Sequence, residues 1–120
     1  MMPETTDPEA VVQKQLDAYN AHDVEALLAV YAIDARLFEH PATLLAEGAV
    51  ELRERFSQRF QEPRLYALLL KRIVMGNFVV DHELVTRSFP EGPGTVQLLA
   101  TYEVLDGRIA NAWFLTGPKA

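Results

Sequence analysis

The sequence predicts an α+β domain in which three N-terminal helices pack on one face of a curved antiparallel sheet. Two observations carry this prediction. Apolar residues recur at helical spacing through residues 8–60, and at every second position through most of residues 64–116. Asp106-Gly107, between two alternating segments, is a typical hairpin turn, so successive strands are expected to pair as neighbours. The expected order of elements is α-α-β-α-β-β-β-β.

Three helices are expected before residue 64. The first begins at Asp7, an N-cap residue type, followed by Pro8 at the first helical position, and it continues to about residue 21. Its apolar stripe is Val12, Leu16 and Tyr19, and the stripe of the second helix, capped by Asp23, is Val24, Leu27, Leu28 and Tyr31. The third helix begins at Gly48 and ends at Pro63, with Ala49, Leu52, Phe56 and Phe60 facing inward.

Five strands are expected beside these helices. A short strand at residues 35–40 is ended by Pro41, and four longer strands at residues 64–75, 78–89, 95–105 and 108–116 form a meander. Gly76-Asn77 is the first hairpin turn of that meander. No repeat or linker interrupts the pattern. Residues 1–6 are therefore expected to be a disordered tail, and residues 7–120 a single domain.

Composition excludes several classes of function. The chain has 120 residues and a formal net charge of −6, which repels a phosphate backbone and argues against a nucleic-acid partner. It has no cysteine, so disulfides, thiolate metal sites and a cysteine nucleophile are excluded. No apolar run approaches the roughly 18 residues of a membrane span, and the first ten residues lack the features of a signal peptide. A cytoplasmic protein with no membrane partner is expected.

Several segments resemble the NTF2-like superfamily, and within it the SnoaL-like and ketosteroid-isomerase-like proteins. They are "YNAHDVEALLAVYAIDA" at 19–35, the strand that ends in "EHP" at 39–41, the helix from Gly48, "GNFVVDHELV" at 76–85 and "YEVLDGRIANAWF" at 102–114. The resemblance covers about residues 8–117. It implies a cone-shaped sheet closed by the helices around a pocket, and usually a dimer through the outer face of the sheet.

The resemblance does not extend to the catalytic residues of ketosteroid isomerases. Those enzymes keep a catalytic aspartate before a proline, where this chain has His40, and an oxyanion-binding tyrosine where it has Gln15. Their protonated aspartate falls at Ala100 or Thr101, and neither is an acid. The departures argue against steroid isomerisation by the family's usual residues, because the same fold hosts unrelated chemistries.

Two histidines are candidate bases, since a neutral imidazole accepts a proton near neutral pH. His40 lies either in the pocket or on its rim, bonded to a backbone carbonyl. In strand 78–89, alternation places Val80, His82 and Leu84 on the more apolar face, which is expected to face the helices. His82 is then either a pocket base or a core histidine satisfied by Gln15 or a tyrosine hydroxyl. The other face, with Asp81, Glu83 and Arg87, is expected to point outward. A third histidine, His22, is expected in a solvated turn.

The candidate catalytic residues are therefore His40, His82 and Tyr19. Tyr19 with Gln15 would polarise a ligand oxygen, although Gln15 also suits the edge of the first helix's apolar stripe. The expected ligand-binding residues are Gln15, Tyr31, Phe56, Phe60, Val80, Leu84 and Tyr102. No cofactor and no metal site are expected, because two histidines without a helical spacing or a nearby inward carboxylate are too few ligands.

The leading hypothesis is a small cavity protein that binds an apolar or aromatic metabolite. As an enzyme it would carry out cofactor-free proton transfer: isomerisation, dehydration or cyclisation. The alternative is a non-catalytic ligand-binding or dimerisation module with a residual pocket. A homodimer is expected through the outer face of the sheet, which is predicted to carry Val79, Val85, Leu99, Ile109 and Trp113.

Overall fold

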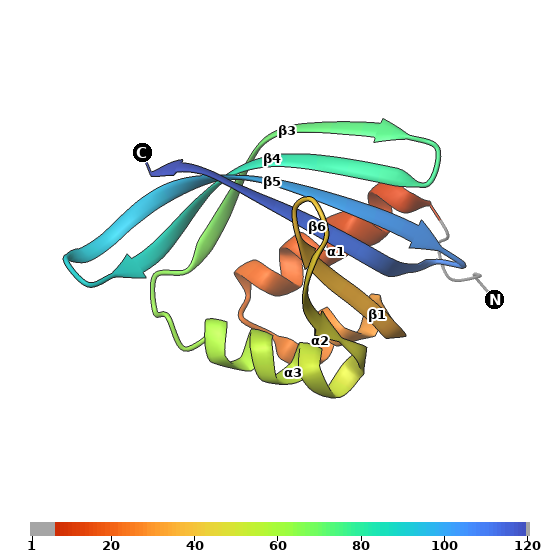
Figure 1. Ribbon diagram of the computed structural model, residues 1–120, viewed down its shortest axis with the longest axis horizontal. Helices are drawn as coiled ribbons and strands as arrows, with labels where there is room; N and C mark the ends of the chain where they lie inside the picture. The colour runs from red at the N-terminus through yellow and green to blue at the C-terminus, as the bar shows by residue number, and fades with distance from the viewer. Residues whose placement is uncertain (1–6, 120) are drawn as a thin grey trace.

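The computed structural model describes residues 7–119, so the tail predicted at residues 1–6 lies outside the described part of the chain. The elements are α1 (Pro8–Asn20), α2 (Val24–Ala29), β1 (Tyr31–Glu39), β2 (Thr43–Glu47), α3 (Gly48–Arg59), β3 (Tyr66–Met75), β4 (Phe78–Phe89), β5 (Gly92–Leu105) and β6 (Arg108–Lys119). Figure 1 shows the strands as one curved layer with the helices on one side of it. The predicted class, helices packed on a curved sheet, is confirmed.

The sheet has six strands among the described residues, in the order β2-β1-β6-β5-β4-β3. Strands β3 to β6 form the predicted antiparallel meander. Strand β1 pairs parallel to β6, which makes the sheet mixed, and antiparallel to β2. Strand β2 was not predicted, and Tyr31, predicted on the second helix, begins β1 instead. The six-residue helix α2 ends at Ala29, where aromatic and β-branched residues favour a strand.

The core lies between the helices and the inner face of the sheet. Its largest fully buried side chains include Val12, Leu27, Leu37, Leu52 and Ile109, which come from both helices and strands. No helix among residues 7–119 is long and apolar enough to span a membrane.

The predicted orientation of strand β4 is wrong. Val79, Asp81, Glu83 and Val85 are buried on the inner face, whereas Phe78, Val80, His82 and Leu84 are only partly buried on the other. Val79, Val85 and Ile109, predicted on the outer face, therefore belong to the core. The apolar face was assigned to the core, but in this sheet the outer face is the more apolar one at β4.

The outer face of the sheet is apolar and exposed. Leu68, Ile73, Leu99 and Leu115 have between 39% and 55% of their surfaces exposed. Trp113 lies with them, partly buried and stacked on Phe38 with their ring centroids 5.7 Å apart.

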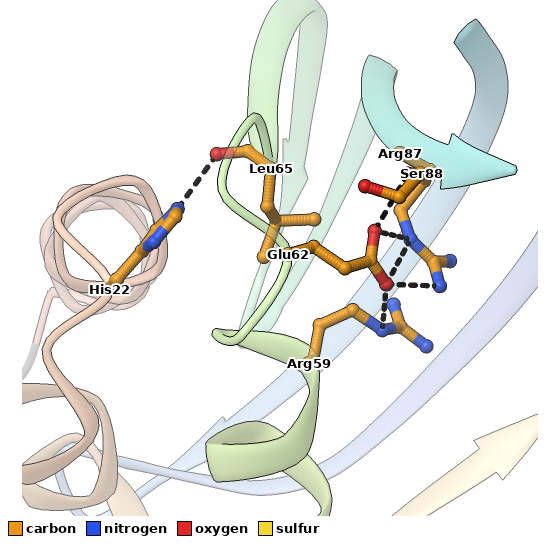
Figure 2. Close-up of polar contacts among 6 residues, drawn as sticks. All are labelled: His22, Arg59, Glu62, Leu65, Arg87 and Ser88. Atoms are coloured by element: carbon orange, nitrogen blue, oxygen red, sulfur yellow. Dashed lines mark hydrogen bonds and ion pairs between the residues drawn. The ribbon is translucent and has the colours of Figure 1, made fainter. Parts of the chain in front are cut away.

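The C-terminal end of α1 is attached to the edge strand β3. The Asn20 side chain donates to the carbonyl oxygen of Ala67 at 3.0 Å and accepts from its N–H at 2.8 Å. The next link is His22, whose Nε2 lies 2.8 Å from the carbonyl oxygen of Leu65 (Figure 2). The His22 ring also stacks on Phe60. His22 is thus half-buried and bonded, not solvated as predicted.

Candidate functional site

A cavity of about 160 Å³ lies between helices α1 and α3 and the inner face of the sheet. Apolar side chains form much of its wall, among them Leu16, Leu37, Phe56, Val85, Leu98 and Phe114. Its polar residues divide by burial. Gln15, Glu83 and Tyr102 are fully buried, whereas Glu39, Arg55, Arg59 and Arg87 are partly or largely exposed. The cavity therefore has an uncharged polar inner end and a charged outer end.

Glu83 is the unusual residue of the inner end. Alternation along β4 turns its side chain inward, and only 4% of its surface is exposed. The carboxyl group makes no hydrogen bond or ion pair with any residue in 7–119. Burial, and to a lesser extent the negative charge of Asp81, raise the pKa of Glu83 to about 8, although Arg72 opposes the shift. Near neutral pH this carboxyl group is thus mostly protonated, with an accessible ionised form.

A chain of hydrogen bonds lies beside Glu83. The Tyr102 hydroxyl donates to Gln15 Oε1 at 3.3 Å, and Gln15 Nε2 donates to the Tyr31 hydroxyl oxygen at 3.4 Å. Burial raises the pKa of Tyr102, of Tyr31 and of Tyr19. The three phenols therefore remain protonated and keep their O–H groups as hydrogen-bond donors.

The outer end of the cavity is dominated by arginines. Glu62 accepts hydrogen bonds from Arg87 Nε and Nη2 at 2.8–3.1 Å and from the Ser88 N–H at 2.9 Å (Figure 2). The same carboxylate lies 3.8 Å from Arg59 Nε. Arg55 makes no hydrogen bond or ion pair with any described residue. Burial, together with the charges of Arg59 and Arg87, lowers the pKa of Arg55.

The structure brings four of the predicted site residues together. Gln15, Tyr19, Phe56 and Tyr102 all line the cavity. Gln15 is only 4% exposed, so it lines the cavity and is not a boundary residue of its helix. Two further predicted residues lie just behind the wall. Tyr31 bonds to Gln15, and Phe60 packs edge-on against Tyr19 with ring centroids 5.5 Å apart.

The other predicted site residues do not line the cavity. His40 is exposed at the end of β1, where its backbone N–H donates to the carbonyl oxygen of Phe114 at 2.8 Å. His82 lies on the outer face with Val80 and Leu84, and its Nε2 is 2.9 Å from Gln97 Oε1. Neither candidate histidine base lines the cavity, because β4 faces the other way and because Glu39, not the next residue His40, lies on the wall.

Sequence reasoning missed the charged residues of the cavity. Glu83 and Arg87 were predicted on the outer face, and Arg55 and Arg59 were not among the residues predicted to face inward on the third helix. The sequence of α1 contained a signal for the correct orientation of β4. Gln15 and Tyr19 place polar groups on the helix face that packs against the sheet, and buried polar groups need polar partners or space for water.

No group of three or more potential metal-ligating side chains is arranged to hold a metal ion in the described part of the chain. The acidic residue nearest to Glu83 along β4, Asp81, is committed to an arginine. Arg72 donates to it twice, from Nε at 2.7 Å and from Nη2 at 2.9 Å, and also to Gln13 Oε1 at 2.9 Å. The chemistry of the site therefore rests on Glu83, the phenols, Gln15 and the arginines.

A known protein family matches most of the chain. The model of the SnoaL-like domain matches residues 12–112. The chain belongs to the SnoaL-like family. The family assignment explains the cone-like sheet and the cavity beneath it, and it confirms the resemblance seen in the sequence. Among curated proteins, none matches the sequence of this SnoaL-like protein.

Solved structures share the fold. A proposed SnoaL-like polyketide cyclase from Jannaschia sp. CCS1 superposes with a TM-score of 0.80 at 18% identity, covering 97% of this chain and 89% of that one. A proposed polyketide cyclase from Sinorhizobium meliloti has a TM-score of 0.73 at 25% identity, covering 88% and 93%. A ketosteroid isomerase-like protein from Catenulispora acidiphila, solved with trimethylamine, has a TM-score of 0.75 at 13% identity, covering 87% and 82%.

Proposed function

We propose that this SnoaL-like protein binds a small, mostly apolar carbonyl compound and catalyses cofactor-free proton transfer, with Glu83 as the group that moves the proton. The single observation that carries the proposal is the Glu83 carboxyl group, buried and without a hydrogen-bond partner in residues 7–119, on the wall of an apolar cavity. A buried acid without a partner is costly, and such groups are concentrated at functional sites. Proposed cyclases among the structural neighbours are consistent with this class of reaction.

The proposed step is an enolisation. The ionised form of Glu83 removes a proton from the carbon next to the ligand's carbonyl group, and the electron pair of the broken C–H bond moves onto the carbonyl oxygen. In a ligand with a double bond next to the deprotonated carbon, the protonated Glu83 returns the proton to the far carbon of that double bond and the carbonyl re-forms, which gives isomerisation. In a ligand with a second carbonyl group, the enolate carbon attacks that carbonyl carbon and its oxygen takes the proton from Glu83, which gives cyclisation. A pKa of about 8 suits this work, because a proton-transfer group is most effective when its pKa lies near the operating pH.

The developing negative charge on oxygen needs hydrogen-bond donors. Gln15 has an amide N–H on the cavity wall, and the phenol of Tyr19 lines the same wall. Tyr19 and Gln15 keep the oxygen-polarising role predicted from the sequence, while Glu83 replaces the histidines as the base. Donors of this kind, fixed before the reaction, typically contribute about two to three powers of ten to the rate.

Proton exchange tests the proposal without knowledge of the natural substrate. Cyclohexanone and cyclohex-3-enone are each incubated with the protein in deuterated water, and loss of the protons next to the carbonyl group is followed by NMR. We expect catalysed exchange whose rate rises with pH to a plateau above the Glu83 pKa of about 8. Glu83→Gln should abolish the exchange.

The matched control is Glu103→Gln. Glu103 is a carboxylate of β5 that accepts a hydrogen bond from Asn111 and does not line the cavity, so its loss should leave the exchange intact. Exchange that survives Glu83→Gln would overturn the assignment of the base. Ligand-induced thermal stabilisation with no exchange of any tested ketone would instead favour the alternative function, a binding module without catalysis.

We also propose a homodimer through the outer face of the sheet. Leu68, Ile73, Leu99 and Leu115 each expose between 39% and 55% of their surfaces there. A patch of this kind on a soluble chain is typical of an interface. Light scattering should give twice the monomer mass, and Leu99→Glu should give a monomer. A wild-type monomer at micromolar concentration would contradict the proposal.

A further inference from the structure

Helix α3 presents two like charges to the cavity. Arg55 and Arg59 lie four residues apart on this helix, and both line the outer end of the cavity with Arg87 of β4. Like charges at this helical spacing repel one another and destabilise the helix. A bound anion would attract both guanidinium groups. The arrangement that destabilises the free protein would therefore stabilise its complex with an anion.

Nearby carboxylates do not account for all three charges. Glu62 is occupied by Arg87 and also approaches Arg59. The remaining acid on the cavity wall besides Glu83 is Glu39, which is exposed and forms no ion pair with Arg55 within 4 Å. Arg55 is thus half-buried and lines the cavity, and although the charge of Glu39 acts on it, it forms no hydrogen bond or ion pair with any residue in 7–119.

Arg53, on the same helix, is an arginine with a structural role and serves as a comparison for Arg55. It lies two residues before Arg55 and forms a two-pronged hydrogen-bonded ion pair with Glu25 of α2 on the exposed surface. Arg53 does not line the cavity, whereas Arg55 does. The same helix therefore holds one arginine that is paired and one that is open to a ligand.

We propose that the ligand of this cavity is a small carboxylic acid whose carboxylate binds the Arg55 guanidinium group, with Arg59 adding positive charge. The placement of its carbonyl group at Glu83 rests on the proposed function; the binding of its carboxylate does not. A guanidinium group matches a carboxylate with two parallel hydrogen bonds, which fixes the ligand's direction in the cavity.

The size and polarity of the cavity define the ligand class further. A cavity of roughly 150 Å³ holds a molecule the size of benzene, and this one measures about 160 Å³. Its walls between the two ends are apolar, with Phe56 and Leu98 among them. The ligand is therefore a one-ring or short-chain keto acid, with its charge at the outer end and its carbonyl carbon at the inner end.

Calorimetry with matched probes tests the carboxylate site. Cyclohexanecarboxylate and benzoate are compared with their uncharged primary amides, which have nearly the same shape. We expect the wild-type protein to bind each acid more tightly than its amide. Arg55→Gln should weaken acid binding by about 10- to 100-fold, which is the range expected for the loss of a hydrogen-bonded charge. It should leave amide binding unchanged.

Two matched variants separate a specific site from a general charge effect. Arg53→Gln removes the same charge from the same helix but should not change acid binding. Glu39→Gln removes a negative charge from the wall and should strengthen it. Equal affinity for acids and amides, or an equal loss in Arg53→Gln and Arg55→Gln, would overturn the proposal.

The two proposals fail in different ways. If the protein catalyses proton exchange in cyclohexanone but binds acids no better than amides, the carboxylate site is wrong and the proton-transfer function stands. The proton-transfer function is wrong if acids bind through Arg55 but the protein catalyses proton exchange in no ketone, 4-oxocyclohexanecarboxylate included.

Discussion

Asp81 and Glu83 are two carboxylates on the same face of the same strand, and they differ in almost everything except burial. Asp81 is 1% exposed and Glu83 is 4% exposed. Asp81 is held by two hydrogen bonds from Arg72. Glu83, two residues further along, makes no hydrogen bond with any residue in 7–119 and faces a cavity. One buried acid thus belongs to the scaffold, and the other is open to a ligand.

The difference shows that burial alone does not define the chemistry of an acid. Burial raises the pKa of Glu83 to about 8, and the ionised Asp81 adds to the shift. Arg72 gives Asp81 a charged partner in the same low-dielectric surroundings. Within this pair, the charge of Asp81 raises the pKa of Glu83 and the charge of Arg72 lowers it.

The largest expected effect on stability comes from removing Arg72, the partner of Asp81. Arg72→Met leaves the Asp81 carboxylate buried without its partner, which should destabilise the fold by roughly 3–5 kcal/mol. Urea denaturation of the two proteins measures the difference. Arg53→Met, which breaks an exposed ion pair, is the control and should change stability little. Comparable losses in both variants would show that the Arg72 pair is not special.

The next largest effect is the pH dependence of stability that Glu83, the acid without a partner, causes. The pKa of Glu83 is raised from 4.5 to about 8 in the folded chain, so the folded state binds more protons than the unfolded state between these values. Stability should therefore fall as pH rises from about 4.5 to about 8, by roughly 4 kcal/mol. Glu83→Gln should remove most of this decline and be more stable than the wild type at the alkaline end. Thermal melts across this pH range measure both effects, and parallel curves for the two proteins would contradict the raised pKa.

The smallest effect distinguishes the causes of the Glu83 shift. Tyr102→Phe removes the hydroxyl that donates to Gln15 and should cost about 1 kcal/mol of stability. The pKa of Glu83 should stay raised, because burial and Asp81 remain. NMR titration of the Glu83 carboxyl carbon in both proteins measures it. A return of this pKa toward its ordinary value would show that the phenol is the controlling group.

Much of this molecule was predictable from local pattern. The order of elements follows from a change of apolar spacing, and the stripe of α1 located Gln15 and Tyr19 on the cavity wall. The orientation of β4 was not predictable in this way, because Val80 and Leu84 on its outer face are as apolar as a core. Inward-facing Asp81 and Glu83 were assigned to solvent for the same reason. Strand β2 was missed because it has only five residues, Thr43–Glu47, and they show no regular apolar alternation.

Strand β3 is the last strand of the sheet, and such a strand offers unpaired N–H and C=O groups to any other extended chain. The end of α1 occupies these groups: the Asn20 amide takes both groups of Ala67, and His22 takes the carbonyl of Leu65. A side-chain amide and an imidazole thus imitate a seventh strand over the first residues of β3. A second polypeptide cannot add to the sheet there, and strand addition in aggregates would have to begin beyond Leu68. Asn20 therefore closes part of the sheet edge as well as joining the helix to the sheet.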